Sequence, residues 1–178
     1  MKTPKPKKPL IYIWTGIGAG KTTSALGVAL RQVAHKQKVI VIQFMKGRKN
    51  IGEYIIKDRL KPYYEIYQFG RKGWVNLKNP SKKDKELAKK GFEFAIEITK
   101  KKKPNLLILD EINLAAAIGL LDPKEVIQRI DKEIPSRTIV YMTGRYAPKE
   151  FLDRADYATE FVTLKQPKEI KAKKGIEY

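Results

Sequence analysis

The chain has 178 residues, a formal net charge of +19 and no cysteine. Its length and its 42% hydrophobic content predict one globular domain over residues 10–178. Residues 1–9 are expected to form a basic, flexible tail. Without cysteine there are no disulfides or cysteine zinc sites, and a single histidine disfavours a histidine site, so any metal is expected on oxygen ligands. No run approaches the roughly 18 apolar residues that span a bilayer, and the start has no apolar signal region, which predicts a soluble, cytoplasmic protein with no membrane partner.

Apolar segments of strand length recur along the chain, and several are apolar on both faces, as buried parallel strands are. They are residues 10–14, 38–44, 63–69, 105–110, 137–143 and 156–162. Helical stretches are expected between them at residues 21–36, at 81–101 with Ser81 as N-cap, from Asp122 and Pro123 onward, and after Pro148. The alternation predicts an α/β fold: a mainly parallel sheet with helices on both faces. Residues 45–53 and 70–81 are expected to be loops at the ligand-binding edge of that sheet.

The stretch TGIGAGKTT, residues 15–23, follows an apolar strand and opens a helix, as a phosphate-binding loop does. Glycines let successive N–H groups face phosphate oxygens, a lysine neutralises them, and a hydroxyl serves a metal or another phosphate. The chain supplies these parts with Gly16, Gly18, Gly20, Lys21 and Thr22. The usual pattern has a glycine where this chain has Thr15, so the motif is a variant. Phosphate binding is favoured over a purely structural glycine turn.

Two more motifs end buried strands at the same expected edge. LLILDEIN places Asp110 and Glu111 where a carboxylate can reach a metal on the phosphates, although the pair could instead cap the next helix. Carboxylate, hydroxyl and phosphate oxygens suit Mg²⁺. YMTGRYAP ends a strand with Arg145, whose planar fork matches phosphate oxygens, with an ion pair inside the fold as the alternative. His35 is expected to be structural.

These motifs leave the reaction open, because nucleoside kinases, motor ATPases and transferases share such apparatus. Taken in order, TGIGAGKTTSALGVALRQVAH, VIQFMKGRKNIGE, ILDEINLAAAIGLLD, TGRYAPKEFLDRADYATE and the terminal KAKKGIEY resemble the ATP-dependent corrinoid adenosyltransferases, from about residue 10 to the C-terminus. The resemblance implies a RecA-like P-loop fold, usually in a homodimer. It also implies transfer of the 5′-deoxyadenosyl group of ATP to the Co(I) centre of a corrinoid with release of triphosphate, in cobalamin biosynthesis or salvage, with Mg²⁺.

By matching position, the resemblance implies a set of site residues. Nucleotide binding falls to Gly16, Ile17, Gly18, Ala19, Gly20, Lys21, Thr22, Thr23 and, on the following helix, Arg31. Lys21, Glu111 and Arg145 are expected to act in catalysis, and Thr22 with Glu111 to hold the metal. Phe69 and Trp74 are expected to contact the corrinoid, although a plain packing role for Trp74 stays equally open. No general base is assigned, because Co(I) is itself the nucleophile.

The chain departs from the family pattern at several positions. Family loops usually read G-N-G-K-G-K-T-T, so Ile17 and Ala19 remove a polar contact and a charge. Candidates to replace that contact are Lys46, Arg48 and Lys49. Asn76 stands where the family has a tryptophan, and Leu114 where a tyrosine is often found.

Two other functions remain open from the sequence. The charge of +19 and the basic tail would fit a P-loop ATPase that binds nucleic acid, but the excess also fits a solvated surface, and no aromatic platform for single strands is evident, so nucleic acid is disfavoured. A nucleoside kinase of related fold is the other alternative, although the zinc-binding cysteines of the thymidine kinases closest in fold are absent. The basic surface would suit an acidic flavoprotein reductase as a partner.

Overall fold

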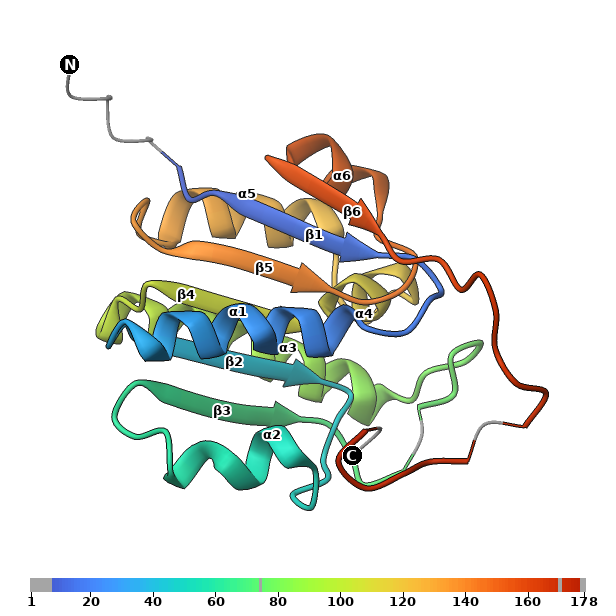
Figure 1. Ribbon diagram of the computed structural model, residues 1–178. Coiled ribbons are helices and arrows are strands. Elements are labelled where there is room, and N and C mark those ends of the chain that lie inside the picture. The colour runs from blue at the N-terminus through green and yellow to red at the C-terminus, as the bar shows by residue number, and fades with distance from the viewer. Residues whose placement is uncertain (1–7, 74, 170, 177–178) are drawn as a thin grey trace.

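The computed structural model describes residues 8–73, 75–169 and 171–176; Trp74 and residues 1–7 of the expected basic tail lie outside the described residues. Six strands form one sheet in the order β3-β2-β4-β5-β1-β6, and all neighbouring pairs are parallel (Figure 1). They are β1 (Ile11–Thr15), β2 (Val39–Phe44), β3 (Tyr64–Phe69), β4 (Leu106–Asp110), β5 (Ile139–Thr143) and β6 (Tyr157–Glu160). The prediction of an α/β fold with a parallel sheet is confirmed.

Helices cover both faces of the sheet, as predicted. They are α1 (Lys21–Ala34), α2 (Gly52–Ile55), the 3-10 turn η1 (Ile56–Asp58), α3 (Lys82–Lys102), α4 (Ile112–Ala117), α5 (Pro123–Glu133) and α6 (Lys149–Arg154). In Figure 1, α1 and α2 lie across one face, while α3 and α5 lie across the other. The short helices α2 and α4 were not predicted, and α2 begins inside the segment expected to be a loop.

The core has one layer on each side of the sheet. Along β1, Ile11 and Ile13 pack with α3, α5 and α6, while Tyr12 and Trp14 pack on the side of α1. All residues of the central strands β2 and β4 are buried. Burial on both faces explains why these strands are continuous apolar runs rather than alternating ones.

The start of α3 is fixed by a capping box that also ties it to the loop after β3. Ser81 Oγ accepts a hydrogen bond from the Asp84 N–H at 3.2 Å, and Asp84 accepts one from the Ser81 N–H at 3.0 Å. The nearly buried Asp84 carboxylate also receives two hydrogen bonds of 2.9 Å from Arg71. The expected N-cap is confirmed, and the ion pair anchors residues 70–73 at the edge of the sheet.

Replacing Asp84 by asparagine is expected to lower the free energy of unfolding by about 2 kcal/mol, because a charged hydrogen-bonded group is lost. Burial alone raises the pKa of Asp84, but the hydrogen bonds from Arg71 and Ser81 outweigh it and hold that pKa below its ordinary value. Such a carboxylate stabilises the fold above its unfolded pKa of about 4 and loses that contribution as the pH falls through the folded value. Urea unfolding should therefore separate the Asp84→Asn variant from wild type most clearly at neutral pH.

The exposed Glu86 on the same helix provides the matched control, Glu86→Gln, which should unfold like wild type. A difference for Asp84→Asn that stays constant from neutral pH down to about pH 2.5 would contradict the charge-based explanation.

Candidate active site

The carboxyl ends of the six strands gather the expected motifs at one edge of the sheet, where open α/β sheets bind ligands. In Figure 1 the segment that follows β6 runs along this edge from the phosphate loop towards the loops after β2 and β3. Phe161 contacts the phosphate loop, and Ala172 lines a hollow beside Lys46 and Arg48. Motifs that are far apart in the sequence therefore meet at this edge.

The first half of the phosphate loop is packed against the backbone of the segment after β6. The N–H of Gly18 donates to the Phe161 carbonyl at 2.8 Å. Gly16 has a φ of +92°, and a Cβ atom built there would lie 2.4 Å from the same carbonyl oxygen. These two glycines are thus required by a close backbone contact. Ile17 and Ala19, which alternate with them, point outward and are exposed.

The second half of the loop offers positive groups to an anion. Helix α1 begins after Gly20 with no side-chain cap, so the N–H groups of its first turn, from Lys21 to Thr23, lack intrahelical partners. Lys21 is only 8% exposed, and its ammonium donates to the Gly18 carbonyl. Burial lowers the pKa of Lys21, and the nearby Glu111 carboxylate only partly offsets this. The arrangement is suited to bind a phosphate group.

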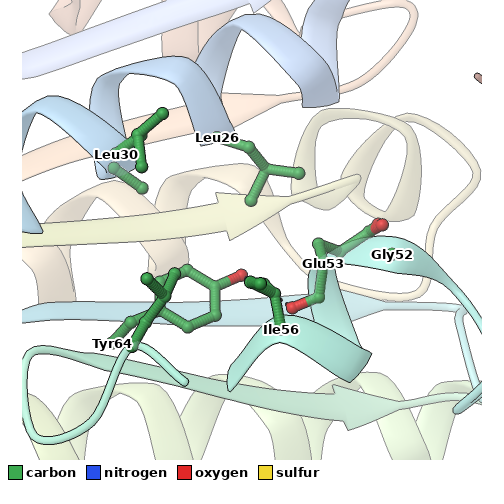
Figure 2. A pocket seen from close by; sticks show the side chains of 8 residues that line it. Leu26, Leu30, Gly52, Glu53, Ile56 and Tyr64 are labelled. Carbon is green, nitrogen blue, oxygen red and sulfur yellow. Dashed lines mark hydrogen bonds between the residues drawn. The ribbon is translucent and has the colours of Figure 1, made fainter. Parts of the chain in front are cut away.

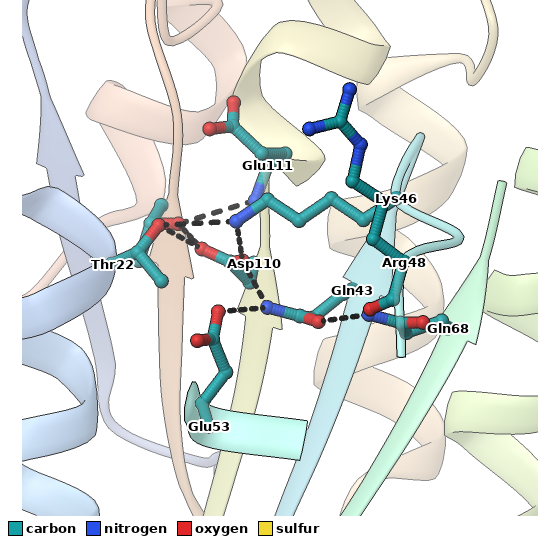
Figure 3. Close-up of polar contacts among 9 residues, drawn as sticks. Thr22, Gln43, Lys46, Arg48, Glu53, Gln68, Asp110 and Glu111 are labelled. Atoms are coloured by element: carbon teal, nitrogen blue, oxygen red, sulfur yellow. Dashed lines mark hydrogen bonds and ion pairs between the residues drawn. The ribbon is translucent and has the colours of Figure 1, made fainter. Parts of the chain in front are cut away.

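Asp110 is the centre of the polar network at this edge (Figure 3). It is fully buried, and its Oδ1 accepts hydrogen bonds of 2.7 Å from the hydroxyls of Thr22 and Thr143. Its Oδ2 receives the Lys46 ammonium at 2.7 Å and the Gln43 amide at 3.0 Å. Burial raises the pKa of Asp110, but these partners outweigh it and leave that pKa below its ordinary value. Among the described residues, it is Asp110 and not Glu111 that bonds Thr22.

Gln43 extends the network towards α2 and β3. Its amide also donates to Glu53 at 3.1 Å, and its carbonyl accepts from Gln68 at 2.9 Å. Neither Gln43 nor Thr143 had an expected role. A polar residue inside the otherwise apolar strand VIVIQF was the signal that could have identified Gln43, because buried polar groups need partners.

Glu111 lies next to this network in a strained backbone conformation, with a φ of +66°. Its Oε2 atom is buried and has no hydrogen-bond partner in the part of the chain that the structure describes. Burial, and then the adjacent Asp110, raise the pKa of Glu111. A buried carboxylate oxygen without a donor is a group that a cation would satisfy.

A cavity of about 230 Å³ opens beside Glu111. Its charged lining residues are Lys46, Glu111 and Arg145. The rest of its lining consists of Phe44, Met45, Gly73, Val75, Leu77 and Leu114. Trp74 lies outside the described residues, but both of its neighbours in the chain line this cavity. A cavity lined by both charged and apolar side chains fits a ligand with a phosphate chain and a large apolar part.

Arg31 lies away from the phosphate loop, and the ring of Phe69 packs on α3. Arg31 is near the end of α1, ten residues and about 15 Å along the helix from Lys21. The ring of Phe69 packs against that of Phe94 on α3, with centroids 5.3 Å apart. Asn76 accepts backbone hydrogen bonds within its own loop. Nucleotide contact by Arg31 and corrinoid contact by Phe69 therefore stay predictions. His35 is the C-cap of α1, and its structural role stays a prediction.

Two polar residues without an expected role, Thr15 and Asn113, hold the loops of the site together. The Thr15 hydroxyl, at the position where the usual motif has glycine, accepts a hydrogen bond from the Ala147 N–H at 3.1 Å. The Asn113 amide donates to the carbonyls of Trp14 at 3.2 Å and Gly144 at 3.3 Å. Both contacts fix the loop that carries Arg145 against the phosphate loop.

A second hollow, of about 310 Å³, lies between α1 and the α2 segment (Figure 2). Leu26, Leu30, Ile56 and Tyr64 are among the residues that line it, and Glu53 is its only charged lining residue. It has no cation to neutralise a triphosphate, so the phosphates are better placed at the edge with Lys21.

The same edge provides oxygen ligands for a metal. The described residues contain no group of three or more histidine, cysteine, aspartate or glutamate side chains that could hold a metal ion. Mg²⁺, however, usually binds one or two carboxylates together with substrate phosphates. Thr22, Asp110 and the unpartnered Oε2 of Glu111 form such an incomplete oxygen set, which fits Mg²⁺ shared with a triphosphate.

Fold and site together define an α/β protein consistent with a P-loop nucleotide-binding fold. The family model described as ATP:corrinoid adenosyltransferase BtuR/CobO/CobP matches residues 7–178, so the chain belongs to this family. The corrinoid adenosyltransferase of Sinorhizobium sp is 33% identical over 181 residues, covering 100% of this chain and 84% of the relative. That of Escherichia coli (strain K12) is 30% identical over 174 residues, covering 97% and 87%. Corrinoid adenosyltransferase CobA of Salmonella typhimurium (strain LT2) is 29% identical over 174 residues, with the same coverage.

No helix in the described ranges is both long and apolar enough to cross a membrane.

Proposed function

We propose that this protein transfers the 5′-deoxyadenosyl group of ATP to the Co(I) centre of a corrinoid and releases triphosphate, as a step of cobalamin biosynthesis. Membership of the corrinoid adenosyltransferase family supports the reaction. The structural observation that supports it most is the buried Lys21 at the start of α1, next to the Thr22–Asp110 pair. Family membership does not favour a nucleic-acid ATPase or a nucleoside kinase.

In this reaction the electron pair of Co(I) forms the bond to C5′, and the bond from C5′ to the phosphate oxygen breaks. Triphosphate leaves with the electron pair of the broken C5′–O bond, so negative charge grows on the oxygen atom that departs from C5′. We assign the stabilisation of this charge to Lys21 and the N–H groups in the first turn of α1, because a nearly buried lysine is poorly screened by water. Arg145 is exposed at the rim of the cavity, from where its guanidinium can close on the phosphates.

We assign the metal ligands to Thr22 and Asp110, with Glu111 as a further oxygen donor as expected from the family. Bound there, Mg²⁺ would neutralise part of the triphosphate charge. A homodimer, a cytoplasmic location, an acidic flavoprotein reductase as electron donor, and corrinoid contact by Trp74 are proposed from the sequence alone.

Product analysis tests the proposed function directly. The protein is mixed with ATP, Mg²⁺ and a corrinoid that has been chemically reduced to Co(I), and adenosylcorrinoid is followed by its absorption spectrum. Triphosphate should form in equal amount, and only when the reduced corrinoid is present. ADP with a phosphorylated nucleoside would instead indicate a kinase, and phosphate release stimulated by polynucleotides would indicate a nucleic-acid ATPase.

A further inference from the structure

Lys46 occupies the place between the two groups that best fit the metal. Its ammonium lies 2.7 Å from Asp110 Oδ2 and 3.5 Å from the Thr22 hydroxyl oxygen (Figure 3). Its side chain is 29% exposed, whereas that of Asp110 is fully buried. The buried carboxylate is thus neutralised by a flexible cation that enters from the side of the cavity.

The backbone around Lys46 is held in a specific conformation. Met45, just before it, has a φ of +57°. A Cβ atom on Gly70 would lie 2.3 Å from the Met45 carbonyl carbon, and one on Gly47 would lie 2.8 Å from the backbone of Arg71. The loops after β2 and β3 therefore touch backbone to backbone, and this contact aims Lys46 at Asp110.

An ammonium at this place and a divalent cation exclude one another. A metal ion bound to Asp110 and Thr22 would stand close to the Lys46 ammonium, and like charges repel one another strongly in a partly buried site. Both cations also need the same Oδ2 lone pairs. Lysine has a flexible four-carbon stem, so its charge can move without displacing the backbone.

We propose that Lys46 holds the Asp110–Thr22 pair when no metal is bound, and that Mg²⁺ with triphosphate displaces its ammonium onto the phosphate chain. There Lys46 supplies the positive charge that the loop lacks because Ala19 stands in place of a lysine. Lys46 already lines the cavity with Glu111 and Arg145, so the movement stays within one site. This proposal rests on the proposed function only for the identity of the phosphate ligand.

Lys46 bonds the network around Asp110 directly, through Asp110 Oδ2 and the Thr22 hydroxyl. Lys49 is exposed and lines a different hollow, together with Gly47, Arg48, Asn50 and Lys72. Arg48 lines the same hollow, and its carbonyl accepts from Gln68 at 2.9 Å. Lys49→Met is therefore a matched control for Lys46→Met, with the same charge removed from the same loop.

Metal binding to the full-length, nucleotide-free protein tests the first half of the proposal. Mn²⁺, used as a paramagnetic probe for Mg²⁺, should bind the Lys46→Met variant about tenfold more tightly than wild type, because its competitor is gone. Lys49→Met should stay within about twofold of wild type. Equal Mn²⁺ affinity in the Lys46→Met variant and wild type would overturn the competition.

Binding of inorganic tripolyphosphate with saturating Mg²⁺ tests the second half. The Lys46→Met variant should bind it about tenfold more weakly, although it binds the metal more tightly. Opposite changes for the two ligands do not arise from partial unfolding, which weakens both. Unchanged tripolyphosphate affinity would overturn the transfer of Lys46 to the phosphates.

A measurement on wild type covers the case in which the variant does not fold. Labelling of Lys46 by an amine-reactive reagent, followed by mass spectrometry, should increase with Mg²⁺ alone and decrease when tripolyphosphate is added; no change in either step would overturn the proposal. None of these experiments contains a corrinoid. If the wild-type protein adenosylates corrinoids but Lys46 and the metal ion do not compete, only this proposal is refuted. If they compete but no corrinoid is adenosylated, only the proposed function is refuted.

Discussion

Replacing Lys21 by alanine is expected to abolish corrinoid adenosylation, with kcat/KM falling at least about a hundredfold. Lys21 is the one lysine of the loop itself, and it lies almost fully buried at the first residue of α1. In such a site its charge is poorly screened by water, so its loss removes stabilisation from the departing triphosphate. The Lys21 ammonium bonds only the Gly18 carbonyl among the described residues, so the fold should survive.

Rates of adenosylcorrinoid formation from pre-reduced corrinoid measure the effect, and thermal unfolding checks that the Lys21→Ala variant is folded. Lys124→Ala, at an exposed position on α5, serves as a control that removes the same charge far from the site. Near-normal turnover of Lys21→Ala would refute the assignment of the phosphate loop to triphosphate.

The sheet could be predicted from the sequence because its central strands β2 and β4 are buried on both faces, and because α3 and α5 begin at clear caps. Ser81 and Asp122 are confirmed as N-caps of α3 and α5. The helices α2 and α4 lack such signals: both are short, and no side chain caps either of them. The start of α4 at Glu111, with its positive φ, is a conformation imposed by the surrounding site.

The phosphate loop could be identified because its residues are contiguous, whereas the network around Asp110 joins distant segments. Asp110 and Glu111 are adjacent carboxylates, and the family resemblance implies that Glu111 holds the metal together with Thr22, which stays a prediction. The hydrogen bond from Thr22 to Asp110 was not expected. The register of β2 and β4 pairs Asp110 with Gln43, so that the two side chains point to the same face, and the sequence alone does not give this register. The contact of Gly18 with Phe161 likewise depends on where β6 lies in the sheet.

Replacing Glu111 by glutamine is expected to stabilise the protein while reducing its activity. The Oε2 atom of Glu111 is buried and has no hydrogen-bond partner in the described part of the chain. Burial and the Asp110 charge raise its pKa, so the ionised form is disfavoured in the folded state. A group with a raised folded-state pKa weakens the fold as the pH rises above its unfolded pKa of about 4. Neutral glutamine of the same shape removes that penalty, by about 1 kcal/mol at pH 7.

Chemical unfolding at two pH values and the Mg²⁺ dependence of adenosylation measure the two effects of Glu111→Gln. The stabilisation should disappear below about pH 4, where the carboxyl group is protonated in both states. Adenosylation should fall at least about tenfold, because a negative oxygen is lost beside the cation site. Asp110→Asn provides the contrast, since it breaks the ion pair with Lys46 and should destabilise the fold. A Glu111→Gln variant that is less stable than wild type would indicate that Glu111 stabilises the fold through an ion pair and does not serve the cation site.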